Sequence, residues 1–237
     1  MIKNKKLLAL IPARGGSKRL IGKNTLELAG KPLIAWSIDA ALASKYVDRV
    51  IVSTDNKAIA DIALKFNAEV PFMRPNHLAT DAASSVDVAV NALECMNDIC
   101  NEDYGFIILL QPTSPLRTFK HIDAAIEMLI DQGAEGIVSI CNKTNSSLDV
   151  NPYPFKLSVK NLTNENPNNM HYNVLSKQYK VNGAIYLSKT DVLIRELSFF
   201  HDKSYMYVMD NDESIDIDYA ADFKLCDLFI SRLGVKS

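Results

Sequence analysis

The chain has 237 residues, of which 48% are hydrophobic and 23% are charged, which is enough for one α/β domain with a small appendage. Its 26 Lys and Arg residues nearly balance 28 Asp and Glu residues, giving a formal net charge of -2, which argues against a nucleic-acid-binding protein that relies on counterion release. The sequence has no apolar run near the ~20 residues of a membrane span and its four cysteines are scattered, so we expect a cytoplasmic protein without a membrane segment and with reduced thiols.

An apolar strand followed by a basic, glycine-containing loop opens the chain. Residues 7–11 are apolar enough for a buried strand, and residues 12–24 then hold three glycines with Arg14, Lys18, Arg19 and Lys23. Glycines let backbone N–H groups approach phosphate oxygens and the cations offset phosphate charge, so this loop predicts a polyphosphate-binding site. Its spacing fits neither the P-loop nor the dinucleotide-binding pattern. The alternative is an ordinary solvated basic turn.

Predicted helices and strands alternate along most of the chain. Strands are expected at 49–53, 69–72, 106–110, 136–140, 183–187 and 205–209, and helices from Pro32, over 57–66 after an Asn56 cap, from Val86, around 122–130, over 189–197 and over 219–233. This alternation predicts a doubly wound, mostly parallel α/β sheet of the Rossmann-like type. Ligands of such sheets bind at the carboxyl ends of the strands, so the loops after Ile11, Ser53 and Leu110 should converge on one crevice.

Residues 142–182 differ from the rest because they contain ten asparagines, several prolines and little periodicity. A compact domain rarely holds so long a structureless loop. We therefore expect a main α/β domain formed by 1–140 and 183–237, with 141–182 as an inserted excursion. Short antiparallel strands are expected in it around 155–159 and 178–181.

An acidic segment near the C-terminus is the second candidate for chemistry. Alternate residues of an extended segment share one face, so Asp216 and Asp218 should point together while Ile215 and Ile217 point into the protein. Such carboxylates suit Mg²⁺, which proteins hold through one or two carboxylates together with substrate phosphates. The alternative is an acidic helix N-terminus.

A polar turn follows the most apolar strand. Gln111, Thr113, Ser114 and Arg117 lie between prolines just after residues 106–110. They could hydrogen-bond a polyhydroxylated ligand or a phosphate. A proline-rich turn whose hydroxyls cap the next helix is the alternative.

Several stretches match one known family in order across nearly the whole chain. They are Ile-Pro-Ala-Arg-Gly-Gly-Ser-Lys at 11–18, Lys-Asn at 23–24, Val-Ser-Thr-Asp at 52–55, Arg-Pro at 74–75, Leu-Leu-Gln-Pro-Thr-Ser-Pro-Leu-Arg at 109–117, Asn-Gly-Ala-Ile-Tyr at 182–186 and Ser-Ile-Asp-Ile-Asp at 214–218. Together they resemble the acylneuraminate cytidylyltransferases, the CMP-sialic acid synthetases. The resemblance implies that the C2 hydroxyl of a nine-carbon 2-keto sugar acid attacks the α-phosphorus of CTP, giving a CMP-sugar and pyrophosphate.

The resemblance also implies a role for each matching position. The triphosphate would be held by Arg14, Gly15, Ser17 and Lys23, and the cytidine by Asn24, Arg74 and Ser85. The sugar would be contacted by Gln111, Thr113, Ser114, Tyr186, Lys156, Phe199 and Phe200, with Arg117 supporting the loop. Asp216 and Asp218 would carry Mg²⁺, or alternatively Mn²⁺, and would form the catalytic set with Arg14 and Lys23. The family's homodimers, in which the excursion reaches the partner's site, imply the same assembly here.

One departure from the family's motifs leaves the identity of the substrate sugar open. Many family members carry Arg-Arg-Gln-Asp-Leu-Pro shortly before the Asn-Gly pair, whereas this chain reads His-Tyr-Asn-Val-Leu-Ser at 171–176. Legionaminic acid or another nonulosonic acid therefore competes with N-acetylneuraminic acid, and Lys177 and Lys180 could replace part of the lost charge. Two other functions stay open: a nucleotide-sugar-dependent glycosyltransferase using the Asp-x-Asp pattern, and a non-catalytic anion-sensing α/β module.

Overall fold

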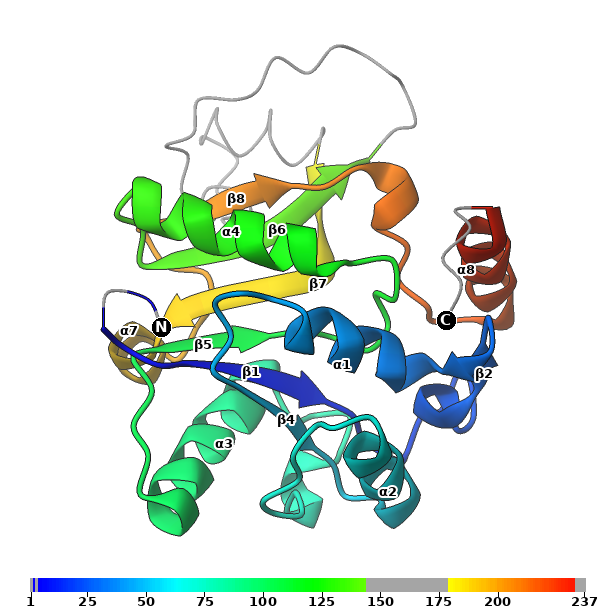
Figure 1. Ribbon diagram of the computed structural model, residues 1–237, viewed down its shortest axis with the longest axis horizontal. Coiled ribbons are helices and arrows are strands. Elements are labelled where there is room, and N and C mark those ends of the chain that lie inside the picture. The colour runs from blue at the N-terminus through cyan, green and yellow to red at the C-terminus, as the bar shows by residue number, and fades with distance from the viewer. Residues whose placement is uncertain (1, 3, 144–178, 233–237) are drawn as a thin grey trace.

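A six-stranded sheet forms the centre of the structure, a computed structural model that describes residues 2, 4–143 and 179–232. The strand order is β4-β1-β5-β7-β6-β8 (Figure 1). The parallel strands are β1 (Leu7–Pro12), β4 (Arg49–Ser53), β5 (Phe106–Leu109), β6 (Gly136–Asn142) and β8 (Ser204–Val208). Strand β7 (Tyr179–Lys189) runs antiparallel to both β5 and β6. The expected mostly parallel sheet is thus confirmed, with the apolar β5 near its centre.

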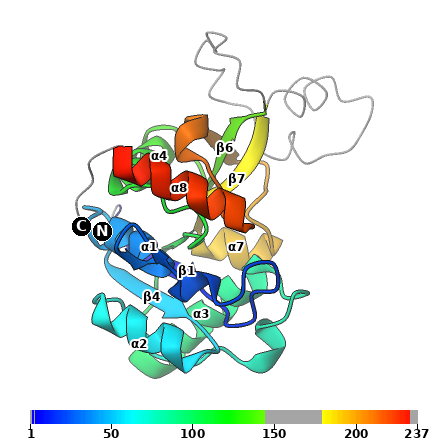
Figure 2. The ribbon, with the colours of Figure 1, turned by 90° about the vertical axis from the view of Figure 1, so that its right-hand side faces the viewer.

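Helices cover both faces of the sheet, as the alternation predicts. One face carries α1 (Leu33–Leu42), α2 (Lys57–Lys65) and α4 (Phe119–Asp131), and the other carries α3 (Ser85–Cys100) and α7 (Thr190–Glu196) (Figure 2). Strand β1 shows why both faces need cover: Leu7, Ala9 and Ile11 pack on the first side, while Leu8 and Leu10 pack on the second. A strand buried on both faces reads as a continuous apolar run.

A third apolar cluster lies beside the carboxyl ends of the parallel strands. Helix α8 (Ala220–Arg232) packs there against the short hairpin of β2 (Glu27–Leu28) and β3 (Lys31–Pro32) (Figure 1). Leu28, Trp36 and Ile217 are among its buried members. This packing brings the C-terminal part of the chain next to the loop that follows β1.

Most element boundaries agree with the sequence expectations. Asn56 caps α2, its side chain accepting a hydrogen bond of 3.2 Å from the Ile59 amide. The predicted strand at 69–72 is wrong, because only an isolated bridge between Ile51 and Glu69 forms there. Pro71 lacks the N–H group that a longer ladder would need.

The flanks of the expected excursion belong to the sheet. Strand β6 extends to Asn142, which pairs with Tyr179 at the start of β7. Residues 144–178, including the expected strand at 155–159 and Lys156, lie outside the described residues. The excursion and its dimerisation role stay predictions. None of the helices in the described residues is long and apolar enough to cross a membrane.

Candidate active site

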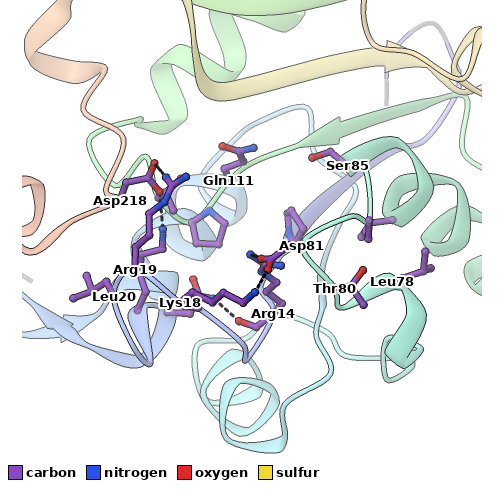
Figure 3. Close-up of a pocket in the computed structure, with 18 of the residues that line it drawn as sticks. Arg14, Lys18, Arg19, Leu20, Leu78, Thr80, Asp81, Ser85, Gln111 and Asp218 are labelled. Carbon is purple, nitrogen blue, oxygen red and sulfur yellow. Dashed lines mark hydrogen bonds and ion pairs between the residues drawn. The ribbon is translucent and has the colours of Figure 1, made fainter.

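A cavity of about 610 Å³ opens where β1 and β5 end, a volume typical of small-molecule sites. Ten of the predicted site residues line it: Arg14, Ser17, Lys23, Asn24, Arg74, Ser85, Gln111, Thr113, Asp216 and Asp218. Figure 3 shows basic side chains of the loop after β1 reaching toward acidic side chains on two sides of the cavity. The loops after Ile11 and Leu110 therefore converge on one crevice as predicted, whereas the loop directly after Ser53, residues 54–56, adds no residue to its described lining.

The loop after β1 is held in shape by its neighbour after β4. The Gly15 amide donates a hydrogen bond of 2.8 Å to Asp55 Oδ1, and a Cβ atom at Gly15 would lie 2.9 Å from Asn56, so a larger residue would displace the loop. The buried Asn24 folds the other end back by donating from Nδ2 to the Arg14 carbonyl at 3.1 Å. The cations between these two anchors are left facing the cavity.

Asp81 is paired with two of those cations. Arg14 Nη2 and Lys18 Nζ each lie 2.5 Å from an Asp81 carboxylate oxygen (Figure 3). These hydrogen bonds, that of Lys18 first, hold the pKa of Asp81 below its ordinary value. Sequence reasoning missed Asp81 because it lies in the irregular segment before α3, without periodicity or a motif. Its carboxylate thus pairs with two cations of the loop that the sequence predicts to bind a polyphosphate.

We expect the Asp81→Asn variant to bind CTP more tightly. The substitution removes a carboxylate that competes with phosphate for Arg14 and Lys18, and exposed ion pairs are worth up to about 1 kcal/mol each. The KM for CTP should fall roughly two- to five-fold with kcat nearly unchanged, measured by steady-state kinetics beside an Asp103→Asn control. An unchanged or higher KM would show that Asp81 does not compete.

Lys23 joins the basic loop to the acidic segment. It begins a short 3-10 helix, η1 (Lys23–Thr25), and its side chain is only 13% exposed. Its Nζ atom donates to the Ile217 carbonyl at 2.6 Å and lies 3.4 Å from Asp218 Oδ1. Arg19 Nη1 lies 2.6 Å from the other Asp218 oxygen. Two segments from opposite ends of the chain thus meet at one point.

The acidic segment has the predicted alternation. Ile217 is fully buried in the third apolar cluster, and its amide donates to the Thr113 carbonyl at 2.8 Å. Asp216 and Asp218 therefore reach the cavity from either side of a buried residue. The backbone amides at the start of α8 are bonded by Asp222 and not by Asp216 or Asp218. The Asp222 Oδ2 atom accepts from the amides of residues 218 and 219 at 3.0 and 2.7 Å.

These two carboxylates fit a divalent metal ion. Partial desolvation raises the pKa of Asp216, and the nearby Asp218 charge adds to this, while a hydrogen bond from Thr113 and the Lys23 charge oppose it. A bound cation would offset the same repulsion. The described residues contain no cluster of three or more metal-ligating side chains. Proteins commonly hold Mg²⁺ through one or two carboxylates together with substrate phosphates and water.

Arg74 is fixed at the end of β4 without an acidic partner in direct contact among the described residues. It is 6% exposed, its Nε donates to Ser53 Oγ at 3.0 Å, and its Nη2 donates to the Ser53 carbonyl. Burial lowers its pKa to about 10. A buried cation at the cavity wall is suited to a ligand's oxygen atoms.

Arg117 anchors the polar turn that carries Gln111. The Arg117 side chain is 1% exposed; its Nη2 donates to Ser37 Oγ at 2.6 Å and to the Gln111 carbonyl at 3.2 Å, and its Nε donates to the Ala184 carbonyl at 3.1 Å. Burial lowers its pKa to about 9. Gly183 (φ +80°) gives Gln111 room, because a Cβ atom there would lie 2.6 Å from Gln111 Oε1. The turn is therefore tied to α1 and β7.

We expect Arg117→Ala to destabilise the fold by about 3 kcal/mol, because it leaves several buried oxygen atoms without a donor. In a domain of this size that corresponds to a fall in Tm of roughly 10 °C. Thermal and urea unfolding should show it, with the exposed Arg195→Ala as control. Equal Tm values for the two variants would contradict the anchoring role.

The remaining sugar-facing candidates are deeper in the protein. Ser114 is fully buried and Phe199 is 2% exposed. Tyr186 lies against Phe199 and Phe200, with ring centroids 5.6 and 6.1 Å apart. Burial, assisted by the Asp216 charge, raises the pKa of Tyr186 to about 12. None of these four appears in the described lining of the 610 Å³ cavity, so their contacts with a sugar stay predictions.

Known proteins resemble this chain along nearly its full length. It is 37% identical over 231 residues to the CMP-N,N'-diacetyllegionaminic acid synthase of Legionella pneumophila, covering 93% of this chain and 94% of that protein. It is 36% identical over 222 residues to an N-acylneuraminate cytidylyltransferase of Escherichia coli, covering 93% of this chain but only 51% of that protein. The chain thus spans about half the length of the second relative.

The fold comparison agrees with the sequence comparison. A CMP:2-keto-3-deoxy-manno-octonic acid synthetase complexed with CTP superposes with a TM-score of 0.68 at 18% identity, covering 96% of this chain and 99% of that one. At that identity the match shows a shared fold. Residues 8–232 match the family described as Cytidylyltransferase. The chain therefore belongs to the cytidylyltransferase family.

Proposed function

We propose that this protein transfers CMP from CTP to the C2 hydroxyl of a nine-carbon 2-keto sugar acid, releasing pyrophosphate, with Mg²⁺ as cofactor and Mn²⁺ as an alternative. One observation carries the proposal. The basic loop after β1 and the acidic segment before α8 meet in one cavity, with Lys23 Nζ 2.6 Å from the Ile217 carbonyl that separates the two aspartates. A metal nucleotide needs both parts together.

The triphosphate would lie along the basic loop. Arg14, Lys18 and Lys23 would neutralise its charge, and Ser17 lies on the same wall. Asn24, Arg74 and Ser85 would contact the cytidine portion from the loop, from the segment after α2 and from the start of α3. This leaves the α-phosphorus beside the acidic segment.

The sugar acid would approach from the side of β5 and β7. Gln111, Thr113 and Tyr186 would orient it so that its C2 oxygen attacks the α-phosphorus in line with the leaving pyrophosphate. The new O–P bond forms as the bond to the β-phosphate oxygen breaks, and the hydroxyl proton is released. A magnesium ion on Asp216 and Asp218 would neutralise developing charge on the phosphates and orient them.

The class of sugar, the assembly and the cellular compartment belong to the same proposal. The relatives' names favour sialic and legionaminic acids as sugar classes. We propose that residues 141–182 form an arm that completes a homodimer, and that the protein acts in the cytoplasm. Size-exclusion chromatography with light scattering tests the dimer.

A substrate panel tests the reaction. Purified protein with CTP and Mg²⁺ is given sialic, legionaminic, pseudaminic and eight-carbon keto-deoxy acids, and pyrophosphate release is followed for each. We expect release with at least one nine-carbon acid and none without an acid. Absence of release across the panel would overturn the proposal.

The same panel separates the two alternatives. A glycosyltransferase would consume a ready-made nucleotide sugar, an activity that the cytidylyltransferase family match does not favour. An anion sensor would bind CTP without turnover. It would release no pyrophosphate in the panel, and no loss of activity specific to Asp216→Asn would be seen. Neither predicts pyrophosphate release that depends on a free sugar acid.

A further inference from the structure

Helix α4 begins beside the segment that leads to the two aspartates. The short helix η3 (Asn211–Glu213) follows β8, and the acidic segment continues from it to the start of α8 (Figure 1). His121, in the first turn of α4, places its Nε2 atom 3.1 Å from Glu213 Oε2. Neither residue is in the described lining of the 610 Å³ cavity, so this pair can act on the site only through the chain that joins it to the aspartates.

The hydrogen bonds of His121 fix which of its ring nitrogens carries the hydrogen atom. The Thr118 amide lies 3.1 Å from His121 Nδ1, and a backbone N–H group can only donate. Nδ1 is therefore an acceptor, so the neutral ring carries its hydrogen on Nε2 and donates it to Glu213. Burial, with a smaller contribution from the Arg117 charge, lowers the pKa of His121 against the opposing charges of Glu213 and Asp210. The neutral ring makes both bonds at once.

The chain around the start of α4 holds the acidic segment at a second point. The Thr113 carbonyl accepts from the Ile217 amide at 2.8 Å, and Arg117, in the same stretch, is bonded to α1 and β7. A single bond would let the acidic segment pivot about Ile217. A second bond four residues earlier, at Glu213, removes that freedom.

A contact from β7 holds the residue next to Glu213. The buried Asn182 donates from Nδ2 to Ser214 Oγ at 2.9 Å, and Ser214 Oγ donates to the Asp210 carbonyl at 2.7 Å. The Asn182–Ser214 bond is buried, whereas the Glu213 side chain is 40% exposed. The pair of His121 and Glu213 can therefore be changed without opening the core.

The position of this segment decides where its carboxylates lie. Asp216 and Asp218 follow Glu213 by three and five residues, and both line the cavity. Magnesium demands nearly ideal octahedral geometry from its ligands. A displacement of about 1 Å far from the reacting atoms can lower a rate ~100-fold. A bond that holds Glu213 therefore bears on catalysis without touching a substrate.

We propose that His121 is a positioning residue for the metal-binding aspartates and that it acts by holding Glu213. This inference rests on the proposed function and adds to it a residue outside the cavity. The Nε2–H group of His121 fixes the acidic segment, while Nδ1 bonds the Thr118 amide at the start of α4. The polar turn, the start of α4 and the acidic segment are thereby set as one unit.

Two substitutions separate the two bonds of the ring. His121→Asn keeps an acceptor near the position of Nδ1 but is too short to reach Glu213, whereas His121→Gln can place a donor near the position of Nε2. His121→Asn should lower kcat roughly 5- to 20-fold and raise the Mg²⁺ concentration for half-maximal activity roughly 3- to 10-fold. Its KM for CTP should stay within about two-fold, because the basic loop is unchanged. Lys120→Asn, exposed in the same turn of α4, is the matched control.

A double-mutant cycle shows whether His121 acts through Glu213. Glu213→Ala should reproduce the loss in kcat, and the double variant His121→Asn/Glu213→Ala should be no worse than either single variant. His121→Gln should stay within about three-fold of the wild-type kcat. Losses that multiply in the double variant would overturn the proposal, as would full activity of His121→Asn or equal losses in the Asn and Gln variants.

Hydrogen exchange followed by mass spectrometry keeps this inference separable from the proposed function. The amides of Ser214 and Ile217 are bonded to backbone carbonyls, so their exchange reports how firmly the segment is held. His121→Asn should speed exchange in a peptide covering 213–218 roughly 3- to 10-fold, and Lys120→Asn should not. Faster exchange supports the positioning role even if pyrophosphate release is never seen, in which case only the proposed reaction fails. Unchanged exchange overturns the positioning role.

Discussion

Replacing Lys23 with alanine should lower kcat roughly 10²- to 10³-fold, a loss typical of removing one group that stabilises transition-state charge. Lys23 joins the two halves of the site, with its Nζ 2.6 Å from the Ile217 carbonyl and 3.4 Å from Asp218 Oδ1. The variant would lose the positive charge that Lys23 would place beside the phosphates. It would also lose the hydrogen bond from Lys23 Nζ to the Ile217 carbonyl, which helps to hold the acidic segment in place. Pyrophosphate release at saturating CTP and sugar acid measures the effect.

Two controls separate these contributions. Lys23→Arg keeps the charge but changes its shape, so we expect an intermediate kcat. Lys57→Ala removes a lysine whose side chain is 89% exposed and should leave kcat unchanged. Circular dichroism should show the same fold in all three variants. A near-normal kcat for Lys23→Ala would remove Lys23 from the catalytic set.

Asp216→Asn and Asp218→Asn should each lower kcat by roughly 10²- to 10³-fold, corresponding to about 3–4 kcal/mol. Asparagine keeps the shape and an oxygen atom but removes the negative charge that a divalent cation requires. The Mg²⁺ concentration needed for half-maximal activity should rise at least ~10-fold. Rates measured across a magnesium titration test both statements.

The two variants should differ in stability. Asp218 also pairs with Arg19 and Lys23, so Asp218→Asn should lower Tm slightly by leaving these cations unpaired. Asp216 has no such pair among the described residues, so Asp216→Asn should leave Tm unchanged or raise it. Asp212→Asn, in the same acidic stretch, is the matched control for activity. Full activity of Asp216→Asn and Asp218→Asn would show that these carboxylates hold no metal.

The sheet could be read from the sequence because its strands are buried on both faces. Residues 49–53, 106–110 and 136–140 form nearly continuous apolar runs, and each became a strand. The hairpin at Glu27–Leu28 and Lys31–Pro32 left no signal, since strands of two residues are too short to show a periodic pattern. Its Leu28 is buried by contacts with residues distant in the sequence. The strand expected at 69–72 failed because Pro71 cannot extend a ladder.

The candidate site was predictable where chemistry follows local pattern. The cations of the first loop and the Asp-x-Asp alternation both appear at one cavity, whereas the glycines of that loop are not in its described lining. Partners distant in sequence were not predictable: nothing local shows that Asp81 meets Arg14, or that Arg19 meets Asp218. The burial of Ser114 was also hidden, because a proline-rich turn can present its hydroxyls to either side.

The most direct test of the reaction identifies its product. Wild-type protein is incubated with CTP, Mg²⁺ and the most active acid of the panel, and the CMP-sugar is quantified by mass spectrometry beside the pyrophosphate released, with Asp216→Asn in parallel. We predict one CMP-sugar for each pyrophosphate from the wild type and almost none from the variant. Pyrophosphate without CMP-sugar, or equal product from both proteins, would contradict CMP transfer at this site.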